Sequence, residues 1–139
     1  MPHRSVSDGS SSAGVDLRRI GFALVVALLA EFLLGLGASL WVTIRPSSPW
    51  SHISDPALFG LHALLGAAIA VMSIVALSRS GDAPGAARLW ASVGLAGVLV
   101  ALLCGLEFVS SGGRSGWSFA MGLGWAVALL ANVCLARGD

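Results

Sequence analysis

Residues 20–44, IGFALVVALLAEFLLGLGASLWVTI, decide the fold, because this long run is apolar apart from the single charged residue Glu31. An α-helix needs about 20 such residues to cross ~30 Å of hydrocarbon, and this stretch is longer than that. The sequence RPSSP at residues 45–49 follows it and is typical of a turn. We therefore expect a first transmembrane helix over residues 20–44.

Three further apolar runs follow, over about 57–77, 89–109 and 117–136, each of about 20 residues. The connections at 80–85 (SGDAPG) and 110–113 (SSGG) are short and carry turn residues. Short connections favour antiparallel neighbours. The sequence therefore predicts an all-α, four-helix transmembrane bundle with up-down-up-down topology.

The overall composition agrees with a membrane protein. Hydrophobic residues make up 56% of the chain and charged residues only 11%, whereas about 25% are charged in an ordinary soluble domain. The formal net charge of +1 argues against a nucleic-acid partner. All eight basic residues are arginine, which with the abundant Ala, Gly and Val indicates a bacterial gene.

The N-terminal residues 1–17 are polar and rich in Ser and Gly, so we expect a disordered cytoplasmic tail before a transmembrane domain at 18–139. Arg18-Arg19 before an apolar run is also found in secretory signals. The length of the run, its glutamate and the three later spans favour a retained helix instead.

The arginines predict the orientation. In the expected topology Arg45 and Arg114 lie on one side of the membrane, and the other six lie on the opposite side: Arg4, Arg18, Arg19, Arg79, Arg88 and Arg137. The positive-inside rule then predicts that both termini lie in the cytoplasm. We expect the host bilayer to be the inner (plasma) membrane of the cell.

Small residues recur at steps of about four in every span, and such faces let transmembrane helices approach closely. We expect helix packing through Gly35, Gly66, Gly97, Ala101, Gly105 and Gly124. The same faces would also suit a second copy of the chain or a larger membrane complex, and the sequence leaves this choice open.

The expected intramembrane polar site comprises Glu31, His62, Glu107 and Asn132. Glu31 lies near the expected midplane, where a charge costs ~2.5–3.5 kcal/mol on insertion scales. One interpretation is a carboxyl that carries protons or binds a cation. The other is a protonated side chain that hydrogen-bonds to a neighbouring helix and fixes the packing.

His62 and Glu107 have similar expected depths toward the outer face, so a histidine–carboxylate hydrogen bond between them is one expectation. They could belong to an outward-facing polar pocket, or be interfacial side chains that reach water. A haem site would need a second imidazole at matching depth, and only His3 and His52 remain. We expect no cofactor, although a haem completed by a second subunit stays open.

The strings EFLLG at 31–35, HALLG at 62–66 and SFAM at 118–121 resemble a family of small four-span bacterial membrane proteins without an assigned function. That resemblance implies four spans and no activity. AEFLLG at 30–35 also looks superficially similar to the first span of small multidrug resistance transporters, which carries an essential carboxylate. This chain has no Tyr and no Lys, and its later helices do not match that family.

Because no catalytic constellation is present, we expect a non-enzymatic accessory or structural membrane subunit. The alternative is a small proton-coupled transporter that uses Glu31. A redox subunit that shares haem is the third hypothesis.

Overall fold

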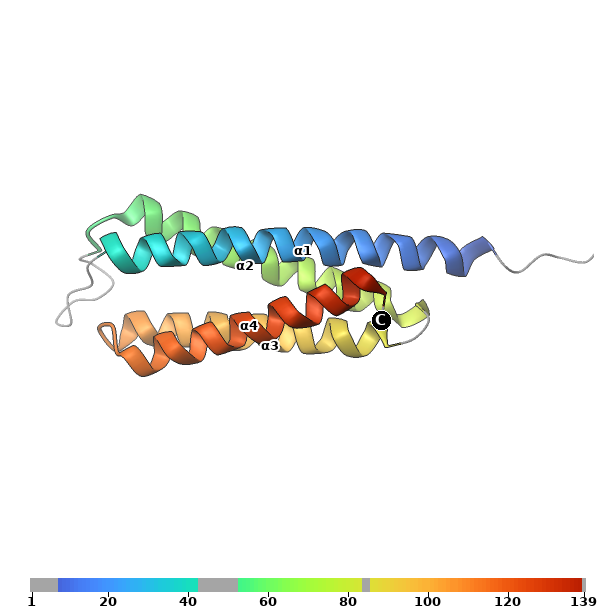
Figure 1. Cartoon of the computed structure of the whole chain (residues 1–139). Coiled ribbons are helices and arrows are strands. Elements are labelled where there is room, and N and C mark those ends of the chain that lie inside the picture. Colours follow the sequence, from blue (N-terminus) through green and yellow to red (C-terminus); the bar gives the residue numbers. More distant parts are fainter. Residues whose placement is uncertain (1–7, 43–52, 84–85, 139) are drawn as a thin grey trace, which may run out of the picture.

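The computed structural model describes residues 8–42, 53–83 and 86–138. They form four helices, α1 (Asp8–Trp41), α2 (Pro56–Arg79), α3 (Ala87–Ser110) and α4 (Ser115–Arg137), with a short 3₁₀ turn η1 (Ser80–Asp82) after α2 (Figure 1). These described segments contain no β-sheet. The expected all-α, four-helix fold is confirmed. Each helix is long and apolar enough to cross a membrane, as expected of an integral membrane protein.

Helices α2, α3 and α4 begin and end within two residues of the expected spans. Helix α1 differs, because it begins at Asp8 and so includes residues 8–17, which were expected to belong to a disordered tail. Leu17 is buried on the same face as Leu24 and Leu28, which holds the part of the extension nearest the expected span in the helix. Residues 1–7 of the expected tail lie outside the described residues, as does the first connection.

Capping residues in the sequence account for the start of α2 and the end of α4. The Asp55 carboxylate accepts a hydrogen bond from the Leu58 backbone N–H at 3.0 Å, and Pro56 occupies the first position of α2. Gly138 ends α4 in the left-handed conformation (φ 83°) and its N–H donates to the carbonyls of Cys134 and Leu135. Both devices satisfy backbone groups that a helix terminus leaves free.

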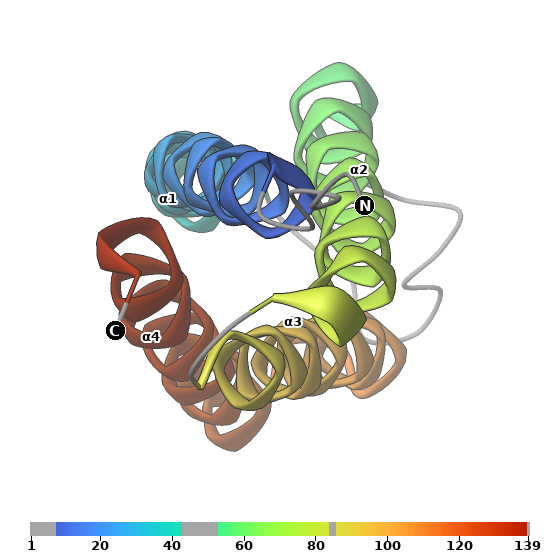
Figure 2. The same ribbon diagram turned by 90° about the vertical axis from the view of Figure 1, so that its right-hand side faces the viewer.

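Seen end-on, the four helices surround a common core, and each has two principal neighbours (Figure 2). Helix α1 packs on α2 and α4, and α3 packs on the same two, with the α3–α4 contact the most extensive. In Figure 1 the end of α1 and the start of α2 lie at one end of the bundle, and the end of α2 and the start of α3 at the other. The central core holds apolar side chains from all four helices: Leu24, Leu28, Ile69, Ala76, Ala91, Val98, Ala128 and Leu135.

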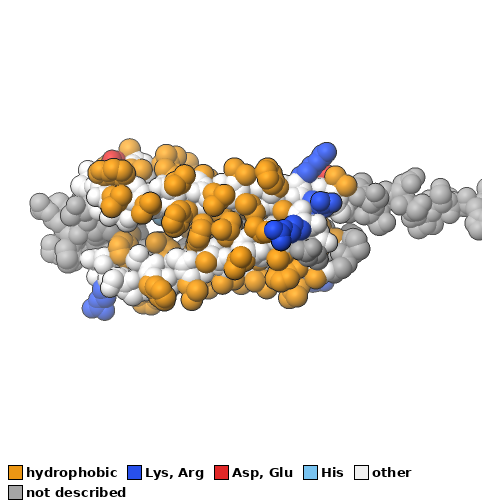
Figure 3. All heavy atoms as spheres, viewed as in Figure 1, with side chains coloured by type: hydrophobic (Ala, Val, Ile, Leu, Met, Phe, Trp, Pro, Cys, Tyr) orange, Lys and Arg blue, Asp and Glu red, His pale blue; other side chains and the backbone are white. Residues whose placement is uncertain are grey.

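The outer surface is apolar along the length of the bundle and basic at its ends (Figure 3). Large side chains such as Leu64 (69% exposed) and Phe119 (76% exposed) point away from the core. An exposed apolar surface of this extent is far beyond the patches of a few hundred Å² that soluble monomers tolerate. A bilayer provides the solvent that such a surface requires.

Candidate functional site

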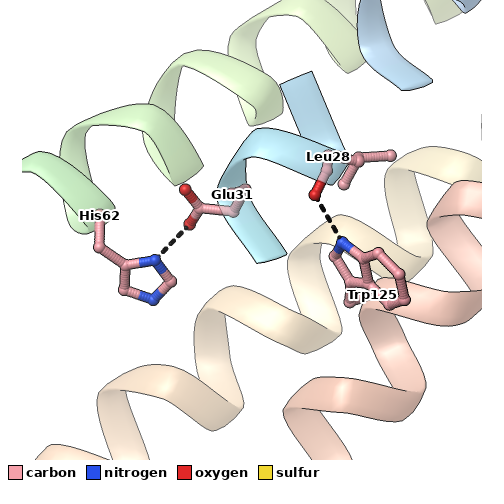
Figure 4. Close-up of polar contacts among 4 residues, drawn as sticks. All are labelled: Leu28, Glu31, His62 and Trp125. Atoms are coloured by element: carbon pink, nitrogen blue, oxygen red, sulfur yellow. Dashed lines mark hydrogen bonds and ion pairs between the residues drawn. The ribbon is translucent and has the colours of Figure 1, made fainter. Parts of the chain in front are cut away.

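Two partly buried ionisable side chains, one from α1 and one from α2, meet inside the bundle. Glu31 Oε1 of α1 lies 3.0 Å from His62 Nδ1 of α2 (Figure 4). The Glu31 side chain is 14% exposed and that of His62 is 22% exposed. Glu31 stands ten residues before the end of α1 and His62 six residues after the start of α2, so the pair lies in the half of the bundle where these two ends meet.

Two glycines make this approach possible, and they are placed reciprocally. Gly35 lies one turn after Glu31, and a Cβ there would be 3.1 Å from Cε1 of the His62 ring. Gly66 lies one turn after His62, and a Cβ there would be 3.0 Å from Oε1 of Glu31. Each helix therefore supplies one ionisable side chain and one glycine that makes room for the side chain of the other helix.

The pair is not fully satisfied by its mutual contact. The two facing atoms are within ion-pair distance, but they lack the alignment of a hydrogen bond. Glu31 Oε2 is also buried and has no hydrogen-bond partner among the residues that the structure describes. Leu102 of α3 approaches Gly66 beside the carboxylate, so an apolar side chain helps to cover it. A buried polar atom without a partner is uncommon and is a reason to look for function at this site.

Trp125 of α4 fixes α1 one turn away from Glu31. Its indole Nε1–H donates to the Leu28 carbonyl at 2.8 Å (Figure 4). The ring also stacks on Phe32, with the ring centroids 4.7 Å apart. The sequence alone did not mark Phe32 or the Leu28 carbonyl as part of this site, because a helix carbonyl carries no sequence signal. Leu102 of α3 and Trp125 of α4 therefore lie close to the pair that α1 and α2 form, so all four helices contribute to this region.

The other two expected site residues lie apart from this pair. Glu107 of α3 is exposed, so the expectation that it would pair with His62 is wrong, and Glu31 takes that place. Asn132 of α4 is buried, and its amide donates to the Ala128 carbonyl one turn before it, at 2.8 Å. The same amide nitrogen lies 3.0 Å from where a Cβ on Gly94 of α3 would stand. Asn132 therefore belongs to the α3–α4 contact.

The expected packing glycines lie at close helix contacts. A Cβ on Gly97 would be 2.7 Å from Ala128 N and from Gly124 O, and a Cβ on Gly124 would be 2.9 Å from Ala101 N. A Cβ on Gly105 would meet the sulfur of Met121 at 3.4 Å. The α3–α4 interface is thus a direct backbone-to-backbone approach.

Two glycines outside the expected set also lie at close helix contacts. A Cβ on Gly21 would be 2.8 Å from Ala136 N, which brings α1 and α4 into backbone contact, and Gly94 faces Asn132. The four-residue spacing gave no signal for Gly21, because the residue one turn later is Val25 and not a second small residue.

Among the described residues, no group of three or more His, Cys, Asp or Glu side chains is placed to hold a metal ion. His3 and His52 lie outside those residues. Comparisons of the chain with protein-family models, with curated proteins and with solved structures found no match.

Proposed function

We propose that this protein is a non-enzymatic accessory or structural subunit of a bacterial plasma membrane, with four spans in up-down-up-down order and both termini in the cytoplasm. The observation that carries this proposal is that three polar side chains inside the bundle lie where two helices meet. Glu31 faces His62, and Asn132 lies in the α3–α4 contact. The role of these groups is then to define one arrangement of the four helices.

The outer surface leaves room for partner helices. Gly60 of α2 and Gly122 of α4 are exposed, and a Cβ on either would meet nothing within 4 Å. In a bilayer such positions allow another helix to approach closely. An accessory subunit would present these positions to the larger complex that it serves.

Native mass spectrometry of the protein, extracted gently from the membranes of its own host, tests the accessory role. We expect a reproducible complex that contains further protein chains. A monomer or homodimer without added mass would contradict the accessory role. If a complex is found, Glu31→Gln and His62→Ala should reduce its yield, whereas Glu107→Gln, which changes an exposed carboxylate, should not.

A second candidate function is proton-coupled transport through Glu31, in a dimer. It is favoured by the buried Glu31 Oε2 atom, which lacks a partner in the described part of the chain and could bind and release a proton beside His62. Proteoliposomes with an imposed pH gradient and tetraphenylphosphonium as a hydrophobic cation test this role. We expect coupled flux that is lost in Glu31→Gln and kept in Glu107→Gln. Equal flux in the wild type and Glu31→Gln, or none in the wild type, would exclude it for this class of substrate.

A further inference from the structure

A second polar feature lies at the other end of the bundle, in an open groove between α1 and the end of α4. The groove has a volume of about 360 Å³ and is lined by Val15, Arg18, Arg19, Phe22 and Ala136. The four residues from α1 follow the spacing i, i+3, i+4, i+7, which places them on one face of the helix. This face combines two guanidinium groups with two apolar side chains.

Close contacts between α1 and the end of α4 form the floor of the groove. Gly21 brings the α1 backbone against Ala136 of α4, where a Cβ would be only 2.8 Å from the Ala136 nitrogen. Arg18 Nε donates to the Ala136 carbonyl at 3.2 Å, and the stem of Arg18 also lies beside Gly138, at 3.5 Å from the position of a Cβ there. The Arg18 side chain is thus held across the end of α4, where a cation also interacts favourably with the helix dipole.

The groove offers donors for an anion. The hydrogen bond to Ala136 uses only Nε of Arg18, and an arginine side chain carries four more N–H donors on its two terminal nitrogens. Arg19 is exposed and forms no ion pair with the residues that the structure describes. Asp16, the nearest acidic residue in the sequence, does not line the groove. Two arginines in this arrangement suit a phosphate group, which a guanidinium binds through two parallel hydrogen bonds.

The apolar wall indicates what carries the phosphate. Phe22 is 66% exposed and Val15 is 48% exposed, and both belong to the segment Gly14–Trp41 that is apolar enough to enter the membrane. A free phosphate ion would gain nothing from these side chains, whereas a phospholipid places its acyl chains beside them when its phosphate reaches the arginines. Basic pockets between transmembrane helices at the membrane surface are suited to anionic lipid headgroups.

We propose that this groove is a binding site for an anionic phospholipid, with Arg18 and Arg19 on the phosphate and Phe22 and Val15 against the acyl chains. The site depends on the placement of the bundle in a bilayer. It does not depend on the accessory role, nor on which side of the membrane is cytoplasmic.

Native mass spectrometry of the purified full-length protein, titrated with phosphatidylglycerol or phosphatidylcholine, tests this site. We expect tighter binding of phosphatidylglycerol, and a loss of about thirtyfold in the double variant Arg18→Gln/Arg19→Gln, from the contribution of two arginines near a lipid surface. Arg114→Gln is the matched control, since it removes an exposed arginine from the start of α4. It should bind phosphatidylglycerol as the wild type does.

Further arms separate a lipid from a free anion and from a folding defect. Phe22→Ala keeps both arginines and should weaken phosphatidylglycerol binding, whereas inorganic phosphate at millimolar concentration should not displace the lipid. The proposal would be overturned by any of three results: equal binding of the two lipids, equal losses of binding in the double variant and in Arg114→Gln, or displacement of the lipid by phosphate. Circular dichroism of every variant should show the helix content of the wild type. If the double variant has lost helix, single Arg19→Gln replaces it, and unchanged lipid binding in that variant overturns the proposal.

Discussion

Glu31 and His62 show how an apolar bundle accommodates two ionisable groups. Each side chain lies against a glycine of the opposite helix, and the facing atoms are 3.0 Å apart. Removing either group alone leaves the other partly buried and unpaired, which is costly in a low dielectric. The contribution of the contact itself therefore has to be measured with both groups changed.

A double-mutant cycle with Glu31→Gln and His62→Ala measures this contribution. We expect a coupling free energy of about 0.5–2 kcal/mol in the free energy of unfolding, the range found for polar contacts between transmembrane helices. Unfolding in bicelles by steric trapping gives the four required values. The cycle of Glu107→Gln with His62→Ala is the control, and it should show no coupling because Glu107 is exposed. Equal coupling in both cycles would contradict the observed pairing.

The sequence identified Glu31 and His62 as site residues but not as partners. Residue counts from the ends of the expected spans put His62 and Glu107 at similar depths. In both ribbon views α2 is inclined to α1, so a count along each helix misplaces the height at which their side chains meet (Figures 1 and 2). Glu107 is also exposed, and a residue count along the helix does not reveal which way a side chain faces.

At the scale of the elements, the α3–α4 contact depends on glycines from both helices. Gly97 and Gly124 bring the two backbones together, with distances of 2.7–2.8 Å from a Cβ on Gly97 or Gly124 to backbone atoms of the facing helix. Because backbone atoms cannot move aside as a flexible side chain can, a methyl group there must push the helices apart.

Gly97→Ala should therefore lower the free energy of unfolding by about 1–3 kcal/mol, the usual cost of overpacking. The matched control is Gly122→Ala, since Gly122 is exposed on α4 and a Cβ there would meet nothing within 4 Å. Its effect should stay within about 0.5 kcal/mol. The same unfolding assay serves both variants. Similar losses in the two would show that α4 and α3 are not packed as described.

Helix lengths were predictable where hydropathy changes sharply, as it does around α2, α3 and α4. The start of α1 could not be predicted in this way, because the Ser- and Gly-rich stretch before residue 18 has the composition of a disordered segment. Next to the expected span, Leu17 is only 2% exposed, and its burial holds the adjoining turn in the helix. Tertiary contact of this kind cannot be read from local composition.

At the scale of the whole molecule, the distribution of charge is the feature that relates the bundle to the two sides of a bilayer. Of the six described arginines, five lie toward the end of the bundle where α2 and α4 finish, and Arg114 lies at the other end: the five are Arg18, Arg19, Arg79, Arg88 and Arg137. Figure 3 shows basic side chains at both ends and an apolar surface between them. This asymmetry was fully readable from the sequence, because it needs only the order of the spans.

Cysteine accessibility tests the orientation that this asymmetry predicts. In a background of Cys104→Ala and Cys134→Ala, single cysteines are placed at Gly81 and Gly116, two exposed positions at which a Cβ meets nothing within 4 Å. With both termini in the cytoplasm, a membrane-impermeant maleimide should label Gly116→Cys in intact spheroplasts, and Gly81→Cys only after permeabilisation. The reverse pattern would mean that the termini face outward. Labelling of both positions in intact cells would contradict the four-span arrangement, because α3 must separate the two sites.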